Sequence, residues 1–380
     1  MTYSLLDILP ATIGALGKNI KINDGTYTSY LQQKLKLPKI NKAIIILCDG
    51  LGYYNLSKAI AYVPFLREHF EKCLLGKTIL PSTTACALTS FAFSLPPGKT
   101  GIMGYKQLNP QTQKVINFLN ATNLDKAPPF AYSKNQKYKT NFELAEEADC
   151  KTASIMEDSF KNSFLTNLYC KGSDIYATNN TQTKIDLSLQ LIEKYNLVYL
   201  YYSNIDKMGH KHGVFSEYWY IALSELDLYL RKIYQKIPHN SLLLLTADHG
   251  MINKNPYTQY DIAKIPQLID NIKAIGGEPR FIHLYLSNTS KLDKTLATWQ
   301  NFWQDKVKII TKQQAINQKL LGSINPQYYS SIGDLIVICQ SFTSILDSRI
   351  PKPNAKLMIG LHGSNSKEEQ TIPIFPIIKN

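Results

Sequence analysis

Several common features are missing from this 380-residue chain, and each absence narrows what it can be. Its six cysteines are scattered and form no C-x-x-C pair, which argues against a zinc knuckle or a dense disulfide framework and favours a reducing compartment. No uncharged apolar run approaches the roughly 18 residues that span a membrane. The N-terminus also lacks the early basic stretch of a signal peptide. We therefore expect a soluble, cytoplasmic protein with no membrane partner.

Acidic residues are scarce relative to basic ones: 29 Asp+Glu against 42 Lys+Arg give a formal net charge of +13. Such an excess suits a nucleic acid, an anionic membrane surface or a small anionic substrate. With 44% hydrophobic and 19% charged residues the chain can bury a core, which excludes a disordered or collagen-like protein.

Short apolar runs alternate with helical patterns along the chain. The runs Ala43–Cys48, Leu197–Tyr202 and Ser241–Thr246 are typical of strands buried on both faces, and Ala153–Met156 is a weaker candidate. Apolar residues recur at helical spacing between the last two strong runs, from Leu223 to Ile237. This alternation predicts an α/β fold in which a parallel-rich central sheet is flanked by helices.

The composition shifts near residue 255, which suggests a boundary. We expect an N-terminal extension (1–39) packed on a catalytic core (40–254 and 346–380), with a smaller α/β lobe (255–345) inserted late in the chain. Arg280, in the segment GGEPRFIH, is expected either to touch substrate from this lobe or to stabilise the lobe.

Acid and imidazole groups follow three of the predicted strands. Asp49 follows the first strong run, Asp206 the second after three residues, and Asp248 with His249 the third. Because ligands bind beyond the carboxyl ends of strands in open α/β sheets, these groups are expected to converge. Carboxylates and neutral imidazoles suit zinc, and also manganese.

Further groups can join this site. His210 lies four residues after Asp206, on the same face of a helical turn, and His362 in GLHGS comes late enough to close the site from the final segment. The segment LPSTTACALTSF predicts a helix that starts after a Ser-Thr-Thr turn, and a hydroxyl there meets free backbone N–H groups that suit a phosphoryl oxygen.

The ordered motifs CDGLG, PSTTACALTSF, DKMGHKHG, TADHGM and GLHGS resemble the alkaline phosphatase superfamily, and within it the nucleotide pyrophosphatase/phosphodiesterase branch with its small bacterial members. The resemblance runs from about residue 40 to the C-terminus. It implies an alkaline-phosphatase-like fold and two divalent metal ions, usually zinc. One ion would be held by Asp49, Asp248, His249 and the Thr84 hydroxyl, the other by Asp206, His210 and His362.

The resemblance also implies that Thr84 is the nucleophile, although the adjacent Thr83 leaves a one-residue slip open. Tyr105 stands where such phosphodiesterases usually carry an asparagine that binds a phosphoryl oxygen, and its hydroxyl can still donate a hydrogen bond to substrate. The implied function is hydrolysis of phosphodiester or pyrophosphate bonds in a small phosphorylated substrate, through a phosphothreonine intermediate.

Three alternatives stay open. A phosphomonoesterase or a phosphonate hydrolase would use the same site. A mutase-type phosphotransferase is less favoured, because such mutases carry a larger insertion and usually a serine. A non-enzymatic nucleic-acid or polyanion binder would suit the charge, but it leaves the Asp and His groups at the strand ends without a role.

Overall fold

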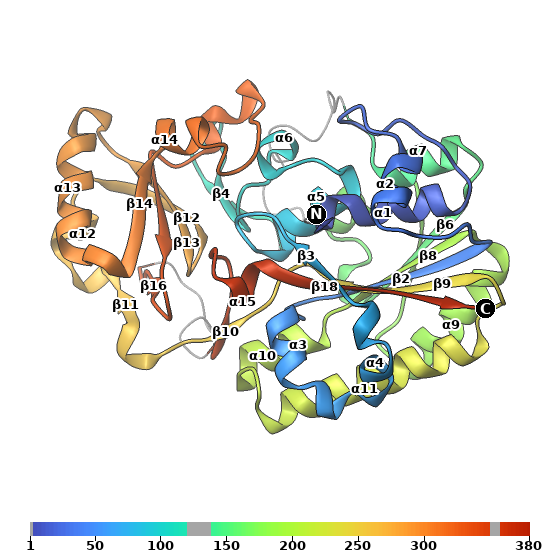
Figure 1. The fold of residues 1–380 in the computed structure, drawn as a ribbon. Helices are drawn as coiled ribbons and strands as arrows, with labels where there is room; N and C mark the ends of the chain where they lie inside the picture. Colours follow the sequence, from blue (N-terminus) through green and yellow to red (C-terminus); the bar gives the residue numbers. More distant parts are fainter. Residues whose placement is uncertain (1–2, 120–137, 350–357) are drawn as a thin grey trace.

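A computed structural model describes residues 3–119, 138–349 and 358–380. At its centre lies an eight-stranded mixed sheet (Figure 1), and the predicted α/β class with a parallel-rich sheet is confirmed. In order across the sheet the strands are β1 (Tyr3–Ser4), β3 (Leu74–Lys77), β18 (Thr371–Lys379), β9 (Ser241–Ala247), β2 (Lys42–Cys48), β8 (Leu197–Tyr202), β6 (Thr152–Met156) and β7 (Asp174–Ala177).

The direction of these strands fixes where the site forms. β18 runs antiparallel to both of its neighbours, and every other neighbouring pair is parallel. The continuous apolar runs form β2, β8 and β9, and all but the first residue of β2 are buried in these three strands. The weaker candidate run forms β6, so all four predicted strands are confirmed.

Helices cover both faces of the sheet (Figure 1). One face carries α1 (Leu5–Ala15), α2 (Thr28–Lys34), α5 (Thr84–Phe93) and α7 (Asn141–Glu147), with α8 (Phe164–Tyr169) packed on α5. The other carries α3 (Tyr53–Lys58), α4 (Pro64–Glu68), α9 (Thr181–Lys194), α10 (Asn204–His212) and α11 (Glu217–Lys236). The predicted crossover helix is α11, which buries the stripe of Leu223, Leu226, Leu230 and Ile233.

A second, four-stranded antiparallel sheet stands beside the central one (Figure 1). Its strands are, in order, β12 (Ile272–Glu278), β13 (Phe281–Leu286), β15 (Leu335–Cys339) and β14 (Val307–Thr311). It has its own apolar core around Trp299 and Trp303 of α13 (Leu292–Trp303). We call the part of the chain that carries this sheet, residues 259–346, the lobe. It also contains α12 (Pro266–Ile269), α14 (Lys312–Asn317), β11 (Gln259–Asp261) and β16 (Ser344–Leu346).

Short elements join the two parts. The chain leaves the central sheet through β10 (Ile252–Asn253) and returns through β17 (Gly360–Leu361), and these two strands pair antiparallel. α6 (Pro97–Thr100) follows α5, the ribbon of β4 (Lys106–Leu108) and β5 (Val115–Asn117) packs on β12, and α15 (Lys367–Gln370) precedes β18. The β10–β17 pairing brings the residues on either side of the lobe together, although more than a hundred positions separate them in the sequence.

The N-terminal residues add to the central sheet and its core. β1 pairs with β3 at the sheet edge, and Leu5, Ile8 and Leu9 of α1 are buried in the main core. Within the described ranges no helix combines the length and the apolar character needed to cross a membrane. All six cysteines are free thiols.

Candidate active site

Three aspartates gather at the carboxyl ends of neighbouring strands. Asp49 directly follows β2, Asp248 directly follows β9, and Asp206 lies in the first turn of α10, just beyond β8. Because β9, β2 and β8 are adjacent and parallel, their carboxyl ends meet at one edge of the sheet. The structure therefore brings together the acids that the strand ends predicted.

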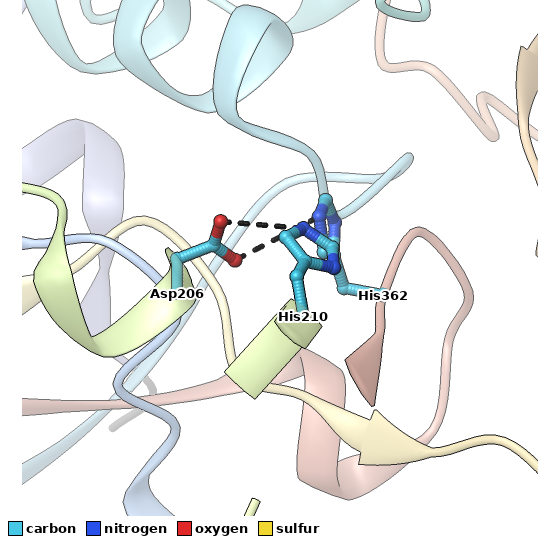
Figure 2. A group of neighbouring side chains, drawn as sticks. All are labelled: Asp206, His210 and His362. Atoms are coloured by element: carbon cyan, nitrogen blue, oxygen red, sulfur yellow. Dashed lines mark ion pairs between the residues drawn. The ribbon is translucent and has the colours of Figure 1, made fainter. Parts of the chain in front are cut away.

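The first histidine group is centred on Asp206 and is shown in Figure 2. His210 Nε2 lies 3.2 Å from Asp206 Oδ2, and His362 Nε2 lies 4.0 Å from Asp206 Oδ1. Asp206 and His210 come from α10, whereas His362 directly follows β17. The three offer ligand atoms within 4.8 Å of one another, as a metal site requires.

A second group lies beside the first and shares Asp206 with it. Asp49, Asp206 and His249 also offer ligand atoms within 4.8 Å of one another. His249 Nε2 is 3.4 Å from Asp49 Oδ1 and 3.5 Å from Asp248 Oδ2. Sequence reasoning assigned Asp206 to one metal only, whereas the structure places it between the two groups.

All three histidines are oriented by backbone carbonyl oxygens. Nδ1 lies 2.8 Å from Gly360 O in His210, 3.2 Å from Gly250 O in His249 and 2.9 Å from Ser82 O in His362. A carbonyl oxygen only accepts, so Nδ1 carries the proton in each ring and donates it. The lone pair of each Nε2 is then directed at the carboxylates, which is the arrangement expected of metal ligands.

The electrostatics of the group favour a cation. Burial, followed by the charges of Asp206 and Asp248, raises the pKa of Asp49 well above its usual value. Burial also raises the pKa of Asp248. Burial and the neighbouring His249 and His210 rings lower the pKa of His362. Crowded buried carboxylates beside neutral imidazoles cost free energy unless a positive charge lies between them.

Two carboxylate oxygens of these groups have no hydrogen-bond partner among the described residues. Asp206 Oδ1 and Asp248 Oδ2 are both buried from solvent and accept no hydrogen bond there. The other oxygen of Asp248 accepts from the backbone N–H of Gly50 and of His249, at 3.1 and 2.9 Å. One oxygen is thus fixed while the other is left for a ligand, so these residues fit divalent metal ions with oxygen and nitrogen ligands.

Thr84 is the first residue of α5 and reaches this group. Its Oγ1 lies 3.3 Å from His249 Nε2 and donates to Asp49 Oδ1 at 3.5 Å. Thr83 is the N-cap residue of the same helix and makes no capping hydrogen bond with its side chain. Of the two threonines, Thr84 is the one whose hydroxyl contacts the Asp and His groups.

The turn before α5 is tied to the segment that carries His362. The Ser82 N–H donates to Gly363 O at 3.1 Å, and the Ser82 hydroxyl donates to Ser364 O at 2.7 Å. With the bond from His362 to Ser82 O, these contacts fix the turn before α5 against the segment that carries the last histidine.

The group opens into a cavity of about 850 Å³ between the central sheet and the lobe. Its lining includes Thr84, Asp49, Asp206, His210 and His362. Tyr105 also lines the cavity, and its backbone N–H donates to Glu278 Oε1 at 3.0 Å. Burial, then the charge of Glu278, raises the pKa of the Tyr105 hydroxyl, which therefore stays protonated as a donor.

Arg280 does not reach the cavity, so the expectation of substrate contact is corrected in favour of its structural alternative. Its side chain is fully buried, and Nε and Nη2 donate to the two Glu369 oxygens at 2.8 and 2.9 Å. The guanidinium also donates to Thr343 O. Arg280 thus links the β12–β13 turn of the lobe to α15 next to the central sheet. Its Nε, Nη1 and Nη2 groups each donate a hydrogen bond within the protein.

One site residue was missed by sequence reasoning. The Tyr201 hydroxyl donates a hydrogen bond to Asp49 Oδ2, the oxygen that faces away from His249. Tyr201 lies in β8, a run in which every residue is apolar or aromatic and buried. The sequence of such a run does not distinguish a tyrosine that only packs in the core from one whose hydroxyl orients a candidate metal ligand such as Asp49.

Comparisons with known proteins agree with this geometry. Residues 43–365 match the sequence pattern of the type I phosphodiesterase/nucleotide pyrophosphatase family. A GPI ethanolamine phosphate transferase 2 from Candida glabrata is 34% identical over 73 residues, which is 19% of this chain and 9% of that protein. The curated relatives matched are thus covered over only a small part of their own length.

Two solved structures share the fold over nearly the whole chain. Murine ectonucleotide pyrophosphatase/phosphodiesterase 5 superposes with a TM-score of 0.67 at 14% identity, covering 88% of this chain and 87% of its own. Phosphonoacetate hydrolase from Sinorhizobium meliloti 1021, in complex with phosphonoformate, superposes with a TM-score of 0.69 at 16% identity. The superposition covers 94% of this chain and 93% of the hydrolase. With the family pattern over most of its length and the alkaline-phosphatase-like fold around the site, this chain belongs to the type I phosphodiesterase/nucleotide pyrophosphatase family.

Proposed function

We propose that the protein is a metal-dependent hydrolase of phosphodiester or pyrophosphate bonds in small phosphorylated substrates, with Thr84 as its nucleophile. The observation that carries the proposal is the position of the Thr84 hydroxyl. It lies at the start of α5, 3.3 Å from His249 Nε2, where the buried Asp49 and Asp248, the partly buried Asp206 and three oriented histidines meet. Such a set is costly to fold without bound cations, which argues for a functional role.

The proposed ligand sets are those that the family resemblance implies, and Asp206, which belongs to both groups, is assigned to the second ion. Asp49, Asp248, His249 and Thr84 would hold one ion, and Asp206, His210 and His362 the other, with zinc the first candidate because the ligands are carboxylate and imidazole. When bound, the ions would supply Lewis-acid stabilisation of negative charge on the reacting oxygens.

The chain's own residues perform the remaining work. Thr84 Oγ1 attacks phosphorus, so that a Thr84–O–P bond forms as the bond to the leaving oxygen breaks. A water molecule then attacks the same phosphorus, releases the phosphate product and restores the threonine hydroxyl. The free N–H groups in the first turn of α5 lie beside the developing negative charge and would stabilise it.

The histidines and Tyr201 keep the geometry fixed during both steps. The proton of each histidine stays on Nδ1 and is donated in a hydrogen bond to a backbone carbonyl oxygen, so Nε2 carries no proton to donate. Tyr201 holds one oxygen of Asp49 and leaves the other toward Thr84. Tyr105 lines the same cavity, and we propose it as a further contact of the substrate.

The test pairs two neighbouring threonines. Thr84→Ala should reduce hydrolysis of bis-p-nitrophenyl phosphate by roughly a thousandfold or more, as expected when a nucleophile is removed. Its metal content should stay near that of the wild type, because the charged ligands remain. Thr83→Ala, the matched control, should retain most of the activity. Undiminished turnover in Thr84→Ala would rule out the nucleophile assignment.

The same site also suits a phosphomonoester or a phosphonate. Parallel assays with p-nitrophenyl phosphate and phosphonoacetate separate these reactions from diester hydrolysis. A preference for p-nitrophenyl phosphate over its diester would assign the enzyme as a monoesterase, and release of phosphate from phosphonoacetate would assign it as a phosphonate hydrolase.

A further inference from the structure

The cavity is lined by two chemically different sets of side chains. One set consists of Thr84 and the metal-ligand candidates, and the other consists of apolar and aromatic residues. The central part of the protein supplies Leu88, Leu165 and Tyr169 to the second set, and the lobe supplies Ile275, Ile282 and Ile345. We call the space between these six residues the apolar chamber. Because both sets line one cavity, a substituent on a phosphoryl group at Thr84 can reach the apolar chamber.

Two of the charged side chains at the walls, Lys207 and Asp347, are already engaged within the protein. Lys207 donates to Glu157, whose other oxygen accepts from the Ser203 hydroxyl. Asp347 pairs with Arg349 at 2.7 Å. Their charges are therefore largely balanced before any substrate binds, and an anionic or cationic substituent gains little from them.

Two small polar side chains on the walls, Ser163 and Ser203, are engaged as well. The Ser163 hydroxyl accepts from the Thr166 N–H at 3.1 Å and caps α8, and the Ser203 hydroxyl is used by Glu157. A nucleoside in the chamber would bury several donors and acceptors of its base. Each one left unpaired would weaken binding. A hydrocarbon group needs no such partners and gains from its transfer out of water.

We propose that the enzyme prefers phosphodiesters in which one substituent is an apolar alkyl or aryl group that occupies the apolar chamber. This inference rests on the proposed function and specifies its substrate class. The reactive phosphoryl group would lie at Thr84, and the hydrocarbon would extend between α5, α8 and the β12–β13 face of the lobe.

A homologous series measures this preference directly. The substrates are p-nitrophenyl methyl, butyl and octyl phosphates, which share one leaving group and differ only in the retained alkyl chain. Burial of a methylene group contributes about 0.8 kcal/mol, so kcat/KM should rise by about two- to fourfold per methylene until the chamber is filled. Equal kcat/KM values along the series would overturn the proposal. A higher kcat/KM for p-nitrophenyl thymidine 5′-phosphate than for the octyl ester would overturn it as well.

Two isoleucines of the lobe sheet give matched variants. Ile275 and Ile309 are both half-buried and pack on the same apolar core, but only Ile275 lines the cavity. Ile275→Thr should lower the octyl-to-methyl ratio of kcat/KM at least threefold, whereas Ile309→Thr should leave it unchanged. An equal decrease of this ratio in both variants would assign the effect to a less stable lobe and would overturn the proposal that the alkyl chain occupies the apolar chamber.

A binding measurement separates this inference from the proposed function. If no ester is hydrolysed, the proposed function fails, and calorimetry with monoalkyl phosphates still tests the chamber. Octyl phosphate should then bind at least tenfold more tightly than methyl phosphate to the wild type, and Ile275→Thr should reduce that difference. Equal affinities for the two phosphates would overturn the inference.

Discussion

At the scale of single residues, the site depends on hydrogen bonds that orient its ligands. Backbone carbonyl oxygens fix the tautomer of His210, His249 and His362. The ligand types could be predicted from the sequence, because an acid or imidazole that follows an apolar strand stands out. The carbonyl partners could not, since the histidines contact only backbone oxygens of Gly360, Gly250 and Ser82, and the positions of those oxygens depend on the fold.

Tyr201 gives the residue-scale prediction. Its hydroxyl donates to Asp49, and partners of this kind typically change metal affinity by 10- to 100-fold when removed. Tyr201→Phe should therefore weaken zinc binding by about 10- to 100-fold while far-ultraviolet circular dichroism stays unchanged. Competition with a chromophoric chelator measures the affinity. Tyr199→Phe, on the same strand with a hydroxyl that has no hydrogen-bond partner within the described ranges, is the control and should bind zinc normally.

At the scale of helices and strands, the sequence predicted what depends on local pattern. The apolar runs became β2, β8 and β9 within one residue, and the Ser-Thr-Thr turn became the start of α5. β18 was not predicted, because Pro373 and Pro376 interrupt its pattern. The register explains why both prolines are tolerated: Pro373 pairs only with β3 and Pro376 only with β9, so each faces a neighbouring strand on one side alone.

A helix capped from another element gives the prediction at this scale. Asp227 of α11 is buried, and its two oxygens accept from the N–H groups of Phe65 and Leu66 at the start of α4, at 3.0 and 2.9 Å. Asp227→Ala leaves both donors buried without partners. It should lower the free energy of unfolding by about 1–3 kcal/mol, as measured by urea denaturation.

The control for this variant lies on the exposed face of the same helix. Glu225→Ala should change the free energy of unfolding by less than about 0.5 kcal/mol, because the side chain is exposed. An equally small change in Asp227→Ala would show that Asp227 does not stabilise α4.

At the scale of the whole molecule, the lobe and the central sheet share one site. The composition shift near residue 255 indicated a lobe, but the sequence could not show which side chains connect it. The connection depends on Arg280 and Glu369, which are far apart in the chain, and on the pairing of β10 with β17. Glu369 also accepts from the Ser364 N–H at 2.9 Å, two residues after His362.

A double-mutant cycle tests this connection. Arg280→Met leaves the Glu369 charge buried and unpaired, and should cost about 3–5 kcal/mol of unfolding free energy. The double variant Arg280→Met/Glu369→Met should cost less than the sum of the single variants, since it removes both charges. Arg231→Met, which breaks the exposed pair with Glu68 at 3.6 Å, should cost less than about 1 kcal/mol. Additive effects of Arg280 and Glu369 would contradict the connection.

The excess positive charge also belongs to this scale. The formal charge of +13 counts Asp49, Asp206 and Asp248 as free acids, whereas bound divalent ions would neutralise them. With the ions in place, the field around the cavity is more positive than the count implies. It would favour the approach of a phosphorylated substrate.

Metal replacement is the most direct test of the central claim that the Asp and His groups form a metal-dependent phosphoesterase site. The purified protein is stripped with a chelator, and zinc is returned stepwise while metal content and hydrolysis of bis-p-nitrophenyl phosphate are measured together. We expect the stripped protein to be inactive and activity to return in full at two equivalents of zinc per chain. Full activity in the stripped protein, or a wild-type protein that binds no divalent ion, would contradict the account.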